Sequence, residues 1–177
     1  MRRFFAGRYR DALAKRAAEG TLRSTTVRTE TLVDFASNDY LGVARDAAFA
    51  AAHFAAEAKR ADAAAGSTGS RLLTGASREH DAFEAFAASF HERESALLFG
   101  SGYAANSAVA ATLPLPTDTI LYDERSHNST RFGLQRSRAL TQISWKHNDL
   151  DDLRNKLRDH DGALVFVEGI YSMDGDE

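Results

Sequence analysis

Residues 119–145 read TILYDERSHNSTRFGLQRSRALTQISW, and their pattern is the clearest guide to the architecture. An apolar run at 119–122 is followed by a polar segment, by a helix-compatible segment at 129–135 and by a second apolar run at 140–144. Two strands that are joined through a helix form a crossover between parallel neighbours. These residues therefore predict one β-α-β unit.

The same alternation continues on both sides of this unit. It predicts further strands at 96–99 and 163–167, the second of them buried, and further helices at 103–111 and 148–158. Strict alternation of strands and helices indicates an α/β fold, in which a parallel sheet carries helices on its faces. We therefore expect a parallel-sheet domain in this part of the chain.

The preceding part of the chain predicts more helix than strand. A first helix is expected to end near Gly20, a short strand to occupy 32–36, and an alanine-rich helix to occupy 46–61. Ser77 is the expected N-cap of another helix. The apolar stripe of that helix is expected to belong to the core, and it consists of Phe83, Phe86 and Phe90.

Composition excludes several classes of protein. The 177 residues are 44% hydrophobic and 27% charged, which is typical of a globular domain. A net charge of −3 provides no general attraction to nucleic acid or to anionic membranes. No apolar run is long enough to span a bilayer, cysteine is absent, and the histidines show no metal-ligand spacing. We expect a cytoplasmic protein without a metal site.

Ligands of parallel sheets bind where strands end and helices begin, here at 100–106 and 123–130. At the first junction GSGY follows a strand and opens a helix, so free amides and the helix dipole can hold a phosphate. A tight turn without a ligand is one alternative. A dinucleotide-binding domain is another, because Gly100, Gly102 and Ala105 satisfy G-x-G-x-x-G/A and Asp123 ends the next strand.

Four blocks of sequence carry a resemblance to a known family. They are SNDYLG at 37–42, GSTGSRLLTG at 66–75, GSGYAAN at 100–106 and EGIYSMDGDE at 168–177. Together they resemble the α-oxoamine synthases, which are fold-type I enzymes. These enzymes use pyridoxal 5′-phosphate (PLP) to join an amino acid to an acyl-CoA with loss of carbon dioxide.

The resemblance implies roles for individual residues. Gly102 and Tyr103 match residues that contact the PLP phosphate. His127, in a D-x-x-x-H-N-S block, matches the catalytic histidine that stacks on the pyridine ring and assists proton transfer. Ser172 matches a residue that donates a hydrogen bond to the phenolic oxygen of PLP. In the glycine-rich block at 66–75, Ser67, Thr68 and Arg71 are candidates for contacts to PLP or CoA.

Two residues are implied to bind the carboxylate of the amino-acid substrate. Asn38 belongs to the SNDYLG block, and Arg23 aligns with an arginine that some members use for this purpose; a planar guanidinium suits a carboxylate. The HND block at 147–149 also matches the family. Its residues are expected only to initiate a helix, with Asn148 as the cap, and to carry no chemistry.

The resemblance also implies an organisation. Residues 1–45 are expected to form an arm and a first strand, and residues 46–177 the N-terminal part of the large PLP-binding domain of a homodimer. The lysine that bonds PLP is expected beyond residue 177, so the chain alone is expected to be inactive. The resemblance favours the branch that makes 8-amino-7-oxononanoate for biotin over the serine palmitoyltransferase branch. A non-catalytic partner subunit is a further alternative.

Overall fold

The computed structural model describes residues 2–25, 33–59 and 66–177. The chain divides into two compact units, residues 1–65 and residues 66–177, which we call the N-terminal unit and the C-terminal unit. The expected division into an arm at 1–45 and a domain from residue 46 stays a prediction.

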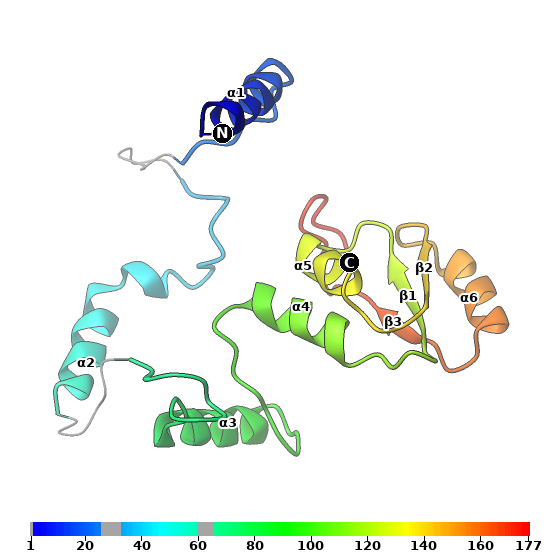
Figure 1. Ribbon diagram of the computed structural model, residues 1–177. Helices are drawn as coiled ribbons and strands as arrows, with labels where there is room; N and C mark the ends of the chain where they lie inside the picture. The colour runs from blue at the N-terminus through cyan, green and yellow to red at the C-terminus, as the bar shows by residue number, and fades with distance from the viewer. Residues whose placement is uncertain (1, 26–32, 60–65) are drawn as a thin grey trace. The chain divides into compact units, whose positions relative to one another are not determined.

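The N-terminal unit begins with α1 (Arg2–Ala18) (Figure 1). The helix ends close to Gly20, as the sequence predicts, and Gly20 has a positive φ of 67°. The N–H of Thr21 donates to the carbonyl of Arg16 at 2.9 Å, and the N–H of Gly20 donates to the carbonyl of Ala17 at 3.2 Å. These two bonds form a Schellman motif, which ends a helix by satisfying its last carbonyls.

The alanine-rich helix is α2 (Ala47–Glu57), which follows a short 3-10 turn, η1 (Val43–Arg45). Asp46 starts α2, because its carboxylate accepts hydrogen bonds from the N–H groups of Ala48 and Phe49 at 2.8 and 2.9 Å. The helix confirms the expectation of helical structure here. Residues 60 and 61, the end of the expected range, lie outside the described residues.

The strand expected at 32–36 is not found in its described part, residues 33–36. The N–H of Ala36 donates instead to the carboxylate of Asp34 at 3.0 Å, a local bond that competes with strand pairing. A β-strand exists only where it pairs with another. The described residues of the N-terminal unit contain no strand to act as a partner.

The C-terminal unit is built on a parallel sheet of β1 (Thr119–Asp123), β2 (Thr141–Trp145) and β3 (Leu164–Phe166). The strand order is β2-β1-β3, and Figure 1 labels the three strands. Asp123 pairs with Trp145, and Tyr122 pairs with Phe166. The carboxyl ends of the three strands therefore meet at one edge of the sheet, which confirms the α/β fold predicted from the alternation.

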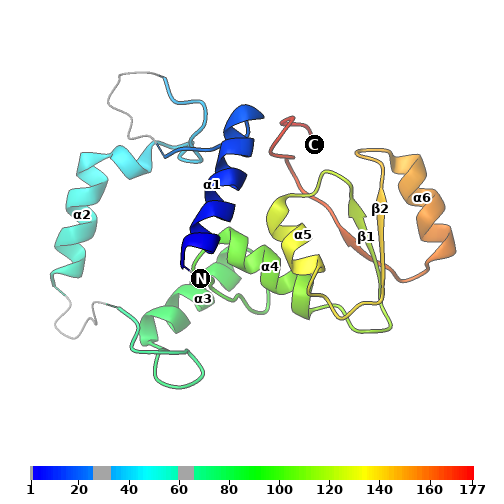
Figure 2. The ribbon, with the colours of Figure 1, turned by 45° about the horizontal axis from the view of Figure 1, so that its top comes forward.

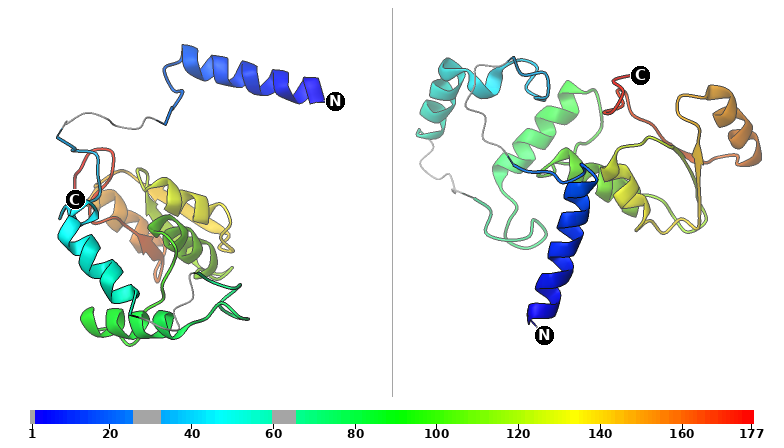
Figure 3. Two further views of the ribbon diagram at one scale, coloured as in Figure 1. Left: turned by 90° about the vertical axis from the view of Figure 1, so that its left-hand side faces the viewer. Right: turned by 90° about the horizontal axis from the view of Figure 1, so that it is seen from above.

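Helices cover both faces of this sheet (Figure 2, Figure 3). On one face lie α4 (Gly102–Thr112) and α5 (Asn128–Leu134), and on the other lies α6 (Leu150–Asp159). All three agree with the helices that the sequence predicts. No helix in the described part of the chain is long and apolar enough to cross a membrane.

The buried core lies between the sheet and the helix pair α4–α5. It contains Ile120 of β1, Leu134 of α5 and Ala110 of α4. The two helices approach closely at Gly133, where an added Cβ would lie 2.5 Å from the carbonyl oxygen of Ser107 and 2.7 Å from the Cβ of Ala110. The glycine therefore sets the distance between α4 and α5.

α3 (Arg78–Phe90) begins at Ser77 as predicted, and the Ser77 hydroxyl accepts from the N–H of His80 at 3.4 Å. The prediction that its phenylalanine stripe belongs to the core is wrong. An amphipathic stripe specifies an apolar face but not the surface that covers it, and the C-terminal unit leaves this face open. The exposed fractions are 49% for Phe83, 63% for Phe86 and 71% for Phe90.

Two expected strands differ from the structure in this unit. Residues 96–99 form no strand, and the N–H of Leu98 donates to the Glu84 carboxylate at 2.7 Å rather than to another strand. The strand expected at 163–167 is present as β3 but is not fully buried, and Val165 is 39% exposed. The reason is that successive side chains of a strand point to opposite faces of the sheet, and Phe166 packs against the core cluster while Val165 lies on the other face.

Candidate functional site

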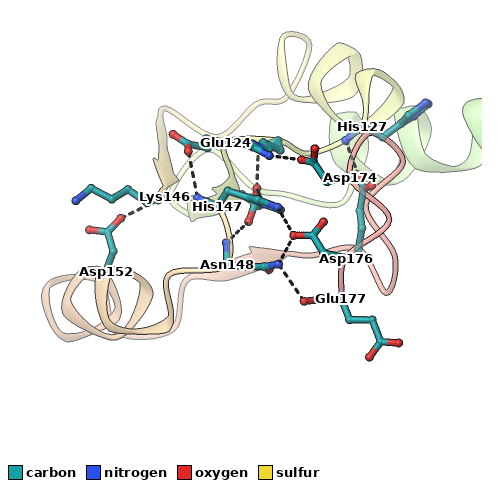
Figure 4. Close-up of polar contacts among 12 residues, drawn as sticks. Glu124, His127, Lys146, His147, Asn148, Asp152, Asp174, Asp176 and Glu177 are labelled. Atoms are coloured by element: carbon teal, nitrogen blue, oxygen red, sulfur yellow. Dashed lines mark hydrogen bonds and ion pairs between the residues drawn. The ribbon is translucent and has the colours of Figure 1, made fainter.

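Most of the candidate site residues predicted from the sequence lie at the carboxyl edge of the sheet. The chain leaves β1 at Asp123 towards α5, leaves β2 at Trp145 towards α6, and leaves β3 towards the segment 168–177, which we call the C-terminal loop. Parallel topology places all three exits side by side. Figure 4 shows the polar contacts that connect them.

The N-terminus of α4 is open and anion-compatible. Ser101 caps the helix, since its hydroxyl accepts from the N–H of Ala104 at 3.1 Å. The N–H groups of Gly102 and Tyr103 belong to the first turn, which has no preceding helical carbonyl to accept them. A Cβ added at Gly100 or at Gly102 would meet no atom within 4 Å. The amides and the helix dipole are therefore accessible to a phosphate.

His127 is the N-cap of α5 and lies exposed at its start. Its Nδ1 accepts from the N–H of Ser129 at 3.2 Å and lies 2.7 Å from the Ser129 hydroxyl. As an acceptor, Nδ1 carries no proton, so Nε2 is the nitrogen left to exchange one. The His127 and Tyr103 rings have centroids 6.3 Å apart and planes 79° apart. The structure thus brings two sequence-predicted residues, from α4 and α5, together.

A cavity of about 440 Å³ opens beside His127, between α4, α5 and the residues that follow β3. This volume falls in the range of small-molecule sites. The lining mixes polar and apolar side chains, and one of the polar ones, Asn106, donates to the Ser129 hydroxyl at 3.2 Å. The lining residues are Ala105, Asn106, Val109, His127, Thr130, Phe166, Val167, Glu168, Gly169 and Ile170.

The C-terminal loop is closed by two backbone hydrogen bonds. The N–H of Tyr171 donates to the carbonyl of Asp176, and the N–H of Gly175 donates to the carbonyl of Tyr171, both at 2.8 Å. Tyr171 is buried, whereas Ser172 lies exposed on the turn that follows it. The loop also reaches α5, since the Glu168 carboxylate accepts from the N–H of His127. Ser172 therefore belongs to a loop that contacts the start of α5.

A buried polar network joins the three strand ends. Asp123 is fully buried, and its carboxylate accepts from the N–H of Arg125 at 2.7 Å, from the N–H of Asn148 at 3.2 Å and from Nδ1 of His147 at 2.9 Å. Nε2 of His147 lies 2.8 Å from the Asp176 carboxylate. His147 thus bridges β1 and the C-terminal loop.

The network shifts the pKa values of its members. Burial alone raises the pKa of Asp123, but the hydrogen bonds from Arg125, His147 and Asn148 outweigh it, and the pKa is lowered. The pKa of His147 is raised, first by its hydrogen bond to Asp123 and then by that to Asp176. The pKa of Asp176 is lowered by its hydrogen bonds, against the effect of burial. All three directions favour an imidazolium between two carboxylates.

The HND block is where the sequence prediction fails. The N-cap of α6 is Asp149, whose carboxylate accepts from Asp151 and Asp152, and not Asn148. Asn148 has a positive φ of 52°, and its side chain donates to Asp176 at 2.9 Å. His147 was expected only to help initiate the helix and to carry no chemistry. A signal was available, because Asp123 directly follows the predicted strand at 119–122 and His147 lies three residues after the predicted parallel strand at 140–144.

Within the described residues, His147, Asp174 and Asp176 also form the one cluster with three possible metal ligands. Both ring nitrogens of His147 are already bonded to carboxylates. Asp174 is paired with Arg125. We therefore interpret the cluster as a hydrogen-bond network.

Asp123 does not fit the dinucleotide alternative. A dinucleotide-binding acid must present its carboxylate to ribose hydroxyls. The Asp123 carboxylate has no exposed surface and is filled by the three donors of the network. The glycine pattern at 100–106 alone therefore does not make a dinucleotide site.

The glycine-rich block at 66–75 forms a compact turn. The hydroxyl of Thr68 donates to the carbonyl of Thr74 at 2.7 Å, and the hydroxyl of Ser67 donates to that of Gly69, also at 2.7 Å. The guanidinium of Arg71 forms two bonds, of 2.6 and 2.9 Å, with the Glu84 carboxylate of α3. This pairing, together with the Leu98 N–H, lowers the pKa of Glu84 to about 2. Arg71 is thus occupied by a structural partner.

The two expected substrate-binding residues lie in the N-terminal unit. Asn38 is exposed in a turn in which the N–H of Asp39 donates to the Ser37 hydroxyl at 3.0 Å. Arg23 is exposed a short distance after α1. Both residues therefore lie in a different unit from His127, and their predicted roles stay predictions.

Comparison with known proteins agrees with the fold and with the resemblance. The profile of the family described as aminotransferase class I and II matches residues 30–177. The putative 8-amino-7-oxononanoate synthase of Bacillus licheniformis is 40% identical over 166 residues, which cover 92% of this chain and 43% of that protein. The chain spans less than half the length of the curated relatives that it matches.

Solved structures are similar over the same part. A serine palmitoyltransferase variant of S. paucimobilis with a bound PLP–myriocin aldimine matches with a TM-score of 0.74 at 26% identity, over 94% of this chain and 45% of that one. The 8-amino-7-oxononanoate synthase of Francisella tularensis matches with a TM-score of 0.62 at 28% identity, over 82% and 39%. The fold-type I architecture is therefore confirmed. With residues 30–177 matched, the chain belongs to the aminotransferase class I and II family.

Proposed function

We propose that this chain is the N-terminal part of a PLP-dependent acyltransferase that condenses an amino acid with an acyl-CoA and releases carbon dioxide. The observation that carries the proposal is the open N-terminus of α4 next to His127, at the carboxyl edge of a parallel sheet and beside a cavity of about 440 Å³. The relatives named 8-amino-7-oxononanoate synthase support the biotin branch as the specific reaction.

The fit of PLP to these residues rests on charge and space. The phosphate carries negative charge, and the N–H groups of Gly102 and Tyr103 and the positive end of the α4 dipole complement it. The absence of a Cβ at Gly102 leaves room for phosphate oxygens against the backbone. We assign Gly102 and Tyr103 as phosphate ligands on this basis.

His127 is assigned to the pyridine ring. Its side chain is held by Ser129 through Nδ1, so the imidazole plane is fixed and Nε2 stays available for proton transfer at the substrate carbon. A fixed aromatic plane at the cavity wall can orient a second flat ring by stacking. Ser172, on the C-terminal loop, is assigned to donate a hydrogen bond to the phenolic oxygen.

When bound, PLP supplies an electron sink for the carbanion that forms at the α-carbon of the amino acid. This chain's residues bind and orient the reactants around it. Arg23 and Asn38 are assigned to the carboxylate of the amino acid, because a guanidinium pairs with a carboxylate bidentately and an amide donates to it. We also propose that an acyl-CoA is the second substrate and that the protein acts as a homodimer.

The lysine that bonds PLP is proposed to lie outside this chain. Its four lysines match no such motif, and two have acidic partners close to them in sequence, namely Glu19 for Lys15 at 3.8 Å and Asp152 for Lys156 at 2.5 Å. The chain by itself is accordingly proposed to be inactive. A full-length protein that also lacked the lysine would be a non-catalytic partner subunit.

Transfer of a palmitoyl group is the second candidate reaction. It is favoured by one observation, the TM-score of 0.74 to a serine palmitoyltransferase. We propose the same residue assignments for both reactions, which differ in the acyl chain and in the amino acid. Assays with pimeloyl and palmitoyl thioesters of CoA separate them.

Substitution of His127 in the full-length protein tests the proposal. His127→Asn keeps a good N-cap for α5 but removes the flat ring, so stability should stay within about 1 kcal/mol of wild type. Turnover should fall by about 10² to 10⁴, as expected for the loss of a proton-transfer group, and the absorbance of bound PLP should change. His91→Asn, at the C-cap of α3, is the control. Unchanged turnover and absorbance in His127→Asn would reject the assignment.

A further inference from the structure

The side chain of His147 lies between two carboxylates that belong to different segments. Nδ1 lies 2.9 Å from Asp123 at the end of β1, and Nε2 lies 2.8 Å from Asp176 in the C-terminal loop (Figure 4). The ring is only 10% exposed. Its centroid is also 4.6 Å from that of the buried Tyr171, at 83° between planes. The histidine is therefore enclosed by groups from the sheet and from the loop.

Both contacts require the ring to donate. A carboxylate only accepts hydrogen bonds, so two such partners are satisfied together only by an imidazolium, in which both nitrogens carry protons. Bonds of this kind are stronger than neutral ones. The raised pKa of His147, with Asp123 as its largest cause, agrees with this protonation state. The charged and titratable groups around His147 are Asp123, Tyr171, Asp174 and Asp176 near its ring and Glu124 at its backbone N–H.

The segment attached in this way is the one that reaches the candidate cofactor site. The loop carries Glu168, which binds the N–H of His127, and Ser172, which follows Tyr171. Its own backbone bonds, between Tyr171 and Asp176 and between Gly175 and Tyr171, close the turn but do not attach it to the sheet. Attachment comes from polar contacts of Asp174, Asp176 and Glu177 with Arg125, His147 and Asn148.

We infer that His147 is a positioning residue of the proposed cofactor site, which anchors the C-terminal loop to the end of β1 and thereby holds Glu168 against the N–H of His127 and fixes the segment that carries Ser172. The inference rests on the proposed function only for the identity of the ligand. His147 touches neither His127 nor the turn at Gly102. It acts through the loop, and its loss should loosen the loop while the sheet stays intact.

Two variants separate anchoring from general stability. His147→Phe keeps an aromatic ring against Tyr171 but removes both nitrogens. Asp176→Ala removes the loop end of the bridge, together with the bond that the Asn148 side chain donates to Asp176, and leaves the contact between Asp123 and His147 in place. Glu177→Ala is the matched control, because it removes a neighbouring acidic side chain and retains the carbonyl that accepts from Asn148 at 3.0 Å.

Amide hydrogen exchange without PLP provides the first readout. In His147→Phe and in Asp176→Ala we expect exchange at the N–H groups of Tyr171 and Gly175 to rise at least about tenfold, since local opening exposes them. Exchange at Leu121, in the centre of β1, should change by less than about threefold in Asp176→Ala. Glu177→Ala should behave as wild type. Unchanged exchange at Tyr171 and Gly175 in Asp176→Ala overturns the inference.

PLP affinity of the full-length protein provides the second readout. Asp176→Ala should raise the dissociation constant of PLP at least about fivefold, and Glu177→Ala should not. A loosened loop with unchanged PLP affinity would overturn the inference, because the anchor would then not serve the cofactor site. If the wild-type protein bound no PLP at all, the proposed function itself would fail. The exchange experiment needs no PLP and would still test whether His147 anchors the loop.

Discussion

The network predicts that Asp123→Asn destabilises the C-terminal unit strongly. The Asp123 carboxylate has no exposed surface. One of its oxygens accepts from Arg125 and His147, and the other accepts from Asn148. Asparagine has one oxygen and one NH₂ group in place of the two carboxylate oxygens. The NH₂ group must therefore point at a group that itself donates a hydrogen bond. The substitution is nearly isosteric, and its effect therefore reports hydrogen bonding and charge rather than packing.

The magnitude follows from the contacts that are lost. An N–H facing the new NH₂ group is left buried without an acceptor, at a cost of about 1–3 kcal/mol. The hydrogen bond from the His147 imidazolium loses its charged acceptor, which is worth about 1.5–3 kcal/mol. Removal of one member of a buried ion pair typically costs about 3–5 kcal/mol. We therefore expect the free energy of unfolding to fall by about 3–5 kcal/mol.

Trp145 provides the assay. It is the only tryptophan of the chain, it is buried, and its Cα pairs with that of Asp123 across β1 and β2. Urea unfolding followed by its fluorescence gives the free energy of unfolding of this unit. Asp151→Asn is the control, because Asp151 forms an ion pair with Arg154 at 2.8 Å but is 87% exposed, and we expect a change below about 1 kcal/mol. Equal effects of the two substitutions would refute the reasoning.

Two further predictions use the same fluorescence. The pKa of His147 is raised from 6.5, so its stabilisation is complete below pH 6.5 and is lost as the pH rises through the folded-state pKa. The pKa values of Asp123 and Asp176 are lowered from 3.8, so their stabilisation is present above pH 3.8 and is lost as the pH falls through the folded-state values. The unit should thus be most stable between about pH 4 and 6.5. A free energy of unfolding that still rose above pH 8 would contradict the loss of stability expected when His147 loses its proton. Gly133→Ala should cost about 1–3 kcal/mol through overpacking against Ser107 and Ala110. A Gly133→Ala variant as stable as wild type would exclude tight α4–α5 packing.

The part of the fold that the sequence predicts well is local. β1, α5, β2 and α6 begin and end within a few residues of expectation, because each has its own apolar pattern and is bounded by turn or capping residues. The strands expected at 32–36 and 96–99 fail for the opposite reason. An apolar run indicates the capacity to pair, but pairing depends on a partner elsewhere in the chain.

In the candidate site, too, the local motifs could be predicted from the sequence and the long-range contacts could not. The turn at Gly102 and the N-cap at His127 could be found because each is a contiguous motif at a strand-to-helix junction. The contacts of His147 with Asp123 and Asp176 could not be predicted from sequence spacing, because His147 lies 24 residues from Asp123 and 29 from Asp176. Only the parallel topology brings these positions to one edge. Phe86 shows a related limit, because its exposure depends on which surface covers α3 and not on its helical spacing.

The central claim is that the N-terminus of α4 binds the phosphate of PLP. The most direct measurement is the change in amide chemical shift of Gly102 and Tyr103 in this chain on titration with PLP, with pyridoxal, which lacks the phosphate, and with NAD. We predict saturable shifts at both amides with PLP and little change with pyridoxal or NAD. Shifts caused by NAD but not by PLP, or equal shifts with pyridoxal and PLP, would contradict the account.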